Sequence, residues 1–77
     1  MTEKANSSEY LVIYERTATG YSAYVPDLPG CITTGPTLPA TRTNMQEAIS
    51  GHLAVMREFG DPIPQPTTIA EPMQVPA

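Results

Sequence analysis

The stretch Tyr21-Ser-Ala-Tyr-Val-Pro-Asp-Leu-Pro-Gly-Cys-Ile-Thr-Thr-Gly35 decides the fold of this chain. An alternating apolar run stops at Pro26, because proline has no N–H to donate to a neighbouring strand. Pro29-Gly30 then turns the backbone, and residues 31–34 are again typical of extended chain. The sequence therefore predicts two strands joined by a rigid corner, since two prolines fix φ within it and a glycine permits the turn.

A first strand is predicted directly before this stretch. Residues 10–16, Tyr-Leu-Val-Ile-Tyr-Glu-Arg, are rich in β-branched and aromatic side chains, and residues 17–20 supply a hairpin loop. If Arg16 opposes Tyr21, the two strands pair Tyr14 with Ala23, Val12 with Val25 and, on the reverse face, Ile13 with Tyr24. A loop of one residue more or less would invert every face. In either register both faces of the sheet carry apolar or tyrosine side chains.

One helix is predicted after Gly35-Pro36. Thr37 is a good N-cap, and Pro39 is tolerated in the first helical turn because its missing N–H would be unpaired there. Apolar residues recur at helical spacing as far as Phe59. We expect Gly51 to let the helix approach the sheet closely, and Gly60 to end the helix in a left-handed conformation.

These elements predict an α+β fold in a single domain covering residues 1–77: a three-stranded antiparallel sheet with one helix on one face. We expect residues 1–8 to fray and residues 67–77 to form a proline-rich tail. Met73 to Val75 could add a short fourth strand at a sheet edge. A single helix covers one face, so the other face is left for a partner or for the tail.

Composition favours a protein partner over a nucleic acid. The formal net charge is −4, and phosphate binding depends on Lys and Arg, of which the chain has four. An acidic surface suits a basic partner, and it also serves solubility. The chain has one cysteine and a polar N-terminus, which predict a cytoplasmic protein, and no apolar run long enough to form a membrane segment. Its small size favours a homodimer or higher homo-oligomer.

The sequence resembles the HicB antitoxin family in an ordered set of short matches. These are Gly20-Tyr21, Val25-Pro-Asp-Leu-Pro-Gly-Cys31, Thr34-Gly35, Thr37, Gly60 and Ile63-Pro64. The resemblance covers roughly Tyr10 to Pro66. It implies a βββαβ domain, a degenerate relative of the ribonuclease H fold, that binds and blocks HicA, a small RNA-cleaving toxin. Many members of that family continue into a DNA-binding domain that represses their own operon, whereas the resemblance in this chain ends before such a domain, which puts autoregulation in doubt. The family's acidic residues in the first helical turn are also missing here.

Five residues are candidates for contact with a partner. Tyr10, Tyr14 and Tyr24 have the apolar ring and hydrogen-bonding hydroxyl that are common at protein interfaces. Asp27 and Leu28 are presented by the proline-bounded corner. The Asp27 carboxylate either accepts backbone N–H groups of its own turn or pairs with an Arg or Lys of the partner.

The sequence offers little for catalysis, and we expect no catalytic residue, cofactor or metal site. Of the acidic residues only Glu15 and Asp27 could approach each other, which is a poor set for a divalent metal. His52 has no second His or Cys at metal-ligand spacing, and Cys31 has no evident base. Two alternatives to an antitoxin remain: an oligomeric scaffold or ligand-binding module without a toxin, and a residual metal-dependent nuclease.

Overall fold

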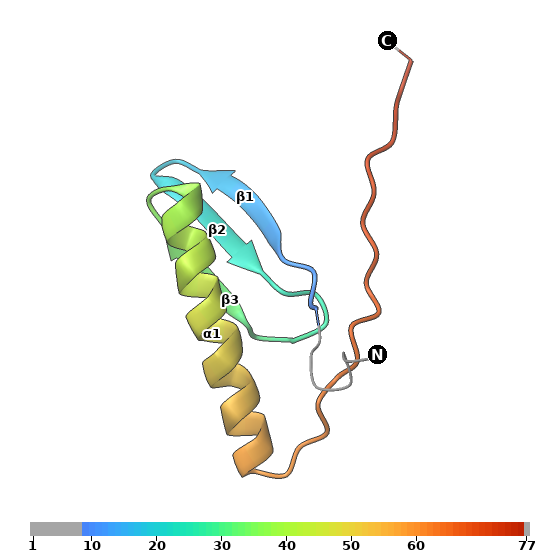
Figure 1. Cartoon of the computed structure of the whole chain (residues 1–77). Helices are drawn as coiled ribbons and strands as arrows, with labels where there is room; N and C mark the ends of the chain where they lie inside the picture. Colours follow the sequence, from blue (N-terminus) through green and yellow to red (C-terminus); the bar gives the residue numbers. More distant parts are fainter. Residues whose placement is uncertain (1–8, 77) are drawn as a thin grey trace, which may run out of the picture.

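The computed structural model of the protein describes residues 9–76 and has the predicted α+β architecture. A three-stranded antiparallel sheet in the order β1-β2-β3 carries one helix across one face (Figure 1). The elements are β1 (Ile13–Thr17), β2 (Gly20–Tyr24), β3 (Ile32–Gly35) and α1 (Leu38–Glu58). The expected fraying of residues 1–8 falls outside the described part of the chain.

The pairing of β1 with β2 confirms the predicted register. Tyr14 lies opposite Ala23, and Arg16 lies opposite Tyr21. On β3, Ile32 pairs with Tyr24, which itself pairs with Ile13. Because side chains of paired residues point to the same face, Ile13, Tyr24 and Ile32 form one row across the sheet.

The corner between β2 and β3 builds the core. Three backbone hydrogen bonds close it: Val25 N–H to Cys31 C=O (3.2 Å), Leu28 N–H to Val25 C=O (3.0 Å) and Cys31 N–H to Leu28 C=O (3.0 Å). This folding turns the Leu28 side chain inward. The buried apolar residues of the described chain include Ala23, Val25, Leu28, Cys31 and Met45.

Both ends of α1 are capped as the sequence predicts. Thr37 has extended backbone dihedrals, and its hydroxyl accepts a hydrogen bond from the Ala40 N–H at 3.2 Å. At the other end Gly60 has φ 72° and donates to Arg57 C=O, while the Asp61 N–H donates to Met56 C=O. This is the Schellman pattern, in which a left-handed residue lets two N–H groups pair with carbonyls of the last turn.

The close approach of helix and sheet occurs at Gly35, and not at Gly51 as we expected. A Cβ added at Gly35 would lie 2.5 Å from Thr41 Oγ1, whereas a Cβ at Gly51 would meet nothing within 4 Å. Thr41 is itself completely buried, and its hydroxyl donates to Thr37 C=O at 2.7 Å. The first turn of α1 is therefore seated on the end of β3, and the middle of the helix is not.

The segment after α1 lies along the domain and then leaves it. The Tyr10 hydroxyl donates to Pro64 C=O at 2.6 Å, but residues 69–76 extend away from the sheet (Figure 1). The radius of gyration, 14.6 Å, exceeds the roughly 11 to 12 Å expected for a compact chain of this length. Residues 73–75, where a fourth strand could have formed, belong to no strand here because they lie apart from both sheet edges.

Candidate partner-binding surface

The face of the sheet opposite α1 is an apolar and acidic surface without a helix over it. We call it the open face; it comprises Ile13, Glu15, Ser22, Tyr24, Ile32 and Thr34. Ile32, the first residue of β3, is 65% exposed, and Tyr24, the last residue of β2, is 40% exposed. Glu15 lies in the next row, opposite Ser22. The open face thus combines two exposed apolar side chains, Tyr24 and Ile32, with a carboxylate.

The three candidate tyrosines do not share this face. Tyr14 pairs with the buried Ala23 and packs against the core under α1, and Tyr10 packs there as well. Only Tyr24 points to the open side, because its position in β2 is one residue out of phase with Ala23. Period-two alternation therefore separates Tyr24 from the other two.

Asp27 ties the corner to the segment that follows the helix. Its Oδ2 accepts the N–H groups of Thr67 (3.1 Å) and Thr68 (3.0 Å), and its Oδ1 accepts their hydroxyls at 3.2 and 2.8 Å. We call this set the Asp27 clasp. The hydrogen bond from the Thr68 N–H is the largest cause that holds the pKa of the Asp27 carboxyl below its ordinary value, because it stabilises the charged form.

Leu28, which we expected the corner to present, is instead completely buried. The two prolines do fix the corner, but its closing hydrogen bonds direct Asp27 outward to the clasp and Leu28 into the core. In this chain the Pro-Asp-Leu-Pro-Gly-Cys string accordingly supplies a core side chain and an anchor for the later segment.

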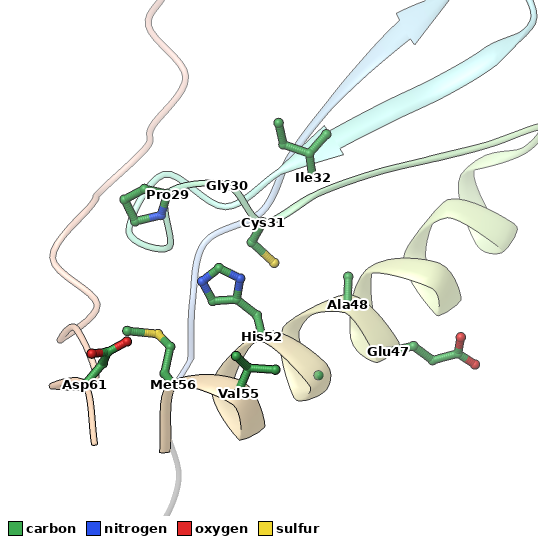
Figure 2. Close-up of a pocket in the computed structure, with 11 residues that line it drawn as sticks. Pro29, Gly30, Cys31, Ile32, Glu47, Ala48, His52, Val55, Met56 and Asp61 are labelled. Atoms are coloured by element: carbon green, nitrogen blue, oxygen red, sulfur yellow. The ribbon is translucent and has the colours of Figure 1, made fainter. Parts of the chain in front are cut away.

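A groove runs between the start of β3 and the second half of α1. We call it the β3 groove; it has a volume of about 770 Å³ and an apolar floor that includes Ala48, Val55 and Met56 (Figure 2). Gly51 leaves its middle empty, since no atom lies near a Cβ built there. His52, Glu47 and Asp61 also line it. The lining of the groove is therefore mostly apolar, with one imidazole and two carboxylates.

The remaining chemistry-bearing residues form no metal cluster within residues 9–76. His52 lines the β3 groove and is half-buried. Cys31 is 3% exposed, and burial raises the pKa of its thiol, which disfavours the thiolate. Both oxygens of Asp27 are already engaged by the clasp.

Comparison with known proteins gives the family. The model for the HicB-like antitoxin of bacterial toxin-antitoxin systems matches residues 10–77, which is most of the chain. The chain belongs to this family. Its resemblance to HicB antitoxins, first visible in the corner between β2 and β3, is confirmed.

This HicB-like chain is also similar to a chain of a solved structure and to a phage protein. It is 30% identical to a chain in a structure described as the HicA3 and HicB3 toxin-antitoxin complex, with a TM-score of 0.68, covering 78% of this chain and 70% of that one. It is also 37% identical over 62 residues to an uncharacterized 14.9 kDa protein from the rep-hol intergenic region of Haemophilus phage HP1. That match covers 80% of this chain and 47% of the phage protein, so this chain spans about half of its length.

Sequence reasoning identified some of these features and missed others. The predicted register already paired Ile13 with Tyr24, and extending it to β3 would have added Ile32 to the row. Thr67 and Thr68 carried no local signal, since they join Asp27 across 40 residues of sequence.

Within residues 9–76, α1 has too little apolar length to cross a membrane.

Proposed function

We propose that this protein is an antitoxin that binds a HicA-like, RNA-cleaving toxin in the cytoplasm and blocks its RNA-cleaving site. The proposal follows from family membership and from the likeness to a chain of a toxin–antitoxin complex. Inhibition is stoichiometric and requires no turnover by this chain. One antitoxin occupies one toxin for as long as the complex lasts.

The row Ile13-Tyr24-Ile32, in which Tyr24 and Ile32 are exposed and Ile13 is half-buried, is the observation that best supports a contact surface. An apolar row with an aromatic side chain at its centre, bordered by polar residues, has the character of an interface core within a polar rim. Glu15 and the net charge of −4 suit a partner that is basic because it handles RNA.

This surface has a direct experimental test. In the variant Glu15→Lys/Tyr24→Lys the open face loses its central ring and gains three units of positive charge. The matched control Ser50→Lys/Glu58→Lys adds the same charge on exposed positions of α1. Both are titrated against a HicA-like toxin and a labelled RNA.

Wild type and control are expected to stop RNA cleavage at one equivalent, whereas the open-face variant should require a large excess. Circular dichroism and urea unfolding of the variants show whether each is folded at the assay temperature. Equal inhibition by the two lysine variants would refute the open face as the contact surface. Inhibition that is sub-stoichiometric and grows with time would refute the blocking mechanism.

A further inference from the structure

Four large apolar side chains of the sheet and the helix end are exposed, and they are neighbours. Tyr24 is 40%, Ile32 65%, Val55 52% and Phe59 73% exposed. Tyr24 and Ile32 pair across β2 and β3, and Ile32 and Val55 both line the β3 groove. The Phe59 N–H donates to Val55 C=O, so these two residues lie one helical turn apart. An apolar strip therefore runs from the open face, around the β3 edge of the sheet, to the end of α1.

The β3 groove forms a hollow within this strip. Gly51 has no side chain, and a Cβ built there would meet no atom within 4 Å. The floor beside it includes Ala48, Val55 and Met56 (Figure 2). A concave apolar surface can seat a side chain of a partner, which buries more area there than on a flat patch.

The β3 edge also offers one backbone position for hydrogen bonding. The Cys31 C=O accepts the Val25 N–H, so Cys31 faces the β2 side and the next residue, Ile32, faces away from it. Thr34 faces the same way as Ile32, but its C=O already accepts Asn44 Nδ2 at 2.9 Å. An extended segment of a partner can thus pair with Ile32, and Asn44 limits how far such pairing continues along β3.

The charge of the groove selects the kind of segment. Among the described residues that line it are the carboxylates of Glu47 and Asp61 and the His52 imidazole, but no lysine or arginine. Figure 2 shows the two carboxylates on either side of His52. Such a surface attracts a cationic side chain. A lysine or arginine can lay its apolar stem on the groove floor and keep its charged end beside a carboxylate.

This charge disfavours the two occupants that the chain itself could supply. Residues 69–76 contain Glu71 and no lysine or arginine. A second copy carries a net charge of −4 and would approach an acidic groove against repulsion. A protein that handles RNA is basic, and such a toxin is already the partner proposed for the open face, which shares Ile32 with the groove.

We infer that the β3 groove is a second contact for the toxin, filled by an extended segment of the toxin that carries lysine or arginine. The inference rests on the proposed function and extends the contact from the open face around the β3 edge. The segment pairs its backbone with Ile32, seats an apolar side chain over Gly51 and places its cation beside Glu47 or Asp61. Contact on both sides of β3 fixes the orientation of the toxin on this chain.

Filling the hollow tests the steric part of the inference. Gly51→Leu puts a branched side chain into the groove without endangering the fold, because leucine is the better helix former and the space around Gly51 is open. The matched control Ser50→Leu adds the same side chain at an exposed position outside the groove lining. In calorimetric titrations with a HicA-like toxin, Gly51→Leu should raise the dissociation constant more than about tenfold, and Ser50→Leu should stay within about threefold of wild type.

Reversal of one charge tests the electrostatic part. Glu47→Lys replaces a carboxylate that lines the groove, whereas Glu58→Lys makes the same change at an exposed position of α1 outside the lining. At low ionic strength Glu47→Lys should weaken toxin binding several-fold more than Glu58→Lys, and the difference should shrink at about 0.5 M salt. Equal weakening by the two variants would show that only net charge matters and would overturn the cationic contact.

Amide hydrogen exchange tests the backbone pairing and the identity of the occupant. The Ile32 N–H should exchange rapidly in the free chain and at least about tenfold more slowly in the complex with the toxin. An Ile32 amide that the toxin does not protect would overturn the pairing. Protection in the free chain that Gly51→Leu removes would assign the groove to residues 69–76 or to a second copy, and would overturn the inference.

These measurements separate failure of the inference from failure of the proposed function. If the wild-type protein does not stop RNA cleavage by the toxin, the antitoxin role fails and this inference fails with it. If the wild type inhibits, Glu15→Lys/Tyr24→Lys does not, and Gly51→Leu binds the toxin as tightly as Ser50→Leu, the groove contact alone is overturned.

Discussion

Truncation of Leu28 separates a structural role of the corner motif from a role in partner contact. Leu28 is completely buried among Ala23, Val25, Cys31 and Met45. Leu28→Ala removes three carbons from this cluster and leaves a cavity that the proline-fixed backbone cannot collapse to fill. We therefore expect a cost of about 3 kcal/mol, within the range of about 2 to 5 kcal/mol found for buried leucines.

That loss is large for so small a domain. At roughly 0.05 to 0.15 kcal/mol per residue, 77 residues give a total stability of about 4 to 12 kcal/mol. With a urea dependence of about 1 kcal/mol per molar, the unfolding midpoint should fall by about 3 M. The ratio of unfolded to folded chains should rise by more than about a hundredfold.

Urea unfolding followed by far-ultraviolet circular dichroism measures the effect. Leu28→Met keeps nearly the same volume and should cost less than about 1.5 kcal/mol. Ile32→Ala, at a 65% exposed position, should change stability by about 0.5 kcal/mol or less. A loss below about 1 kcal/mol for Leu28→Ala would show that the side chain is not part of the core and would refute the reasoning.

Three further predictions concern the clasp and two glycines. Because hydrogen bonds lower the pKa of Asp27, the clasp should hold at neutral pH and be lost as the pH falls through that lowered pKa. The NMR chemical shifts of the Thr67 and Thr68 amides should follow this titration. A titration midpoint at or above the ordinary aspartate pKa would contradict the clasp. Gly35→Ala should destabilise the fold by about 1 to 3 kcal/mol in urea unfolding, since the new Cβ would clash with Thr41; an unchanged midpoint would count against the close packing seen there. Gly51→Ala, where the space is open, should stabilise by about 0.5 to 1 kcal/mol, and a loss of stability would mean that the groove is not empty.

The sequence predicted those features whose causes are local. Alternation and the hairpin loop set the register of β1 against β2, because a shift of one residue would have moved Tyr14 and Ala23 away from the helix. Thr37 and Gly60 set the helix ends, since capping depends on residues within one turn. These features needed no knowledge of distant contacts.

Features that depend on distant segments were not predicted. The proline-bounded corner suggested an exposed loop, but hydrogen bonds between its two ends bury Leu28. Asp27 finds its donors in a proline-rich segment without periodicity, 40 residues later. The sequence pattern also predicted the close contact between helix and sheet at Gly51, whereas it occurs at Gly35. A glycine in a sequence permits a neighbouring segment to approach, but the sequence alone does not show which glycine is approached.

Titration of a HicA-like toxin with this protein, read out as cleavage of a labelled RNA, tests the central claim most directly. The wild type and Ser50→Lys/Glu58→Lys should abolish cleavage at one molar equivalent, and Glu15→Lys/Tyr24→Lys should leave most of it. If cleavage continues in the presence of several equivalents of folded wild-type protein, the antitoxin role of this chain is contradicted.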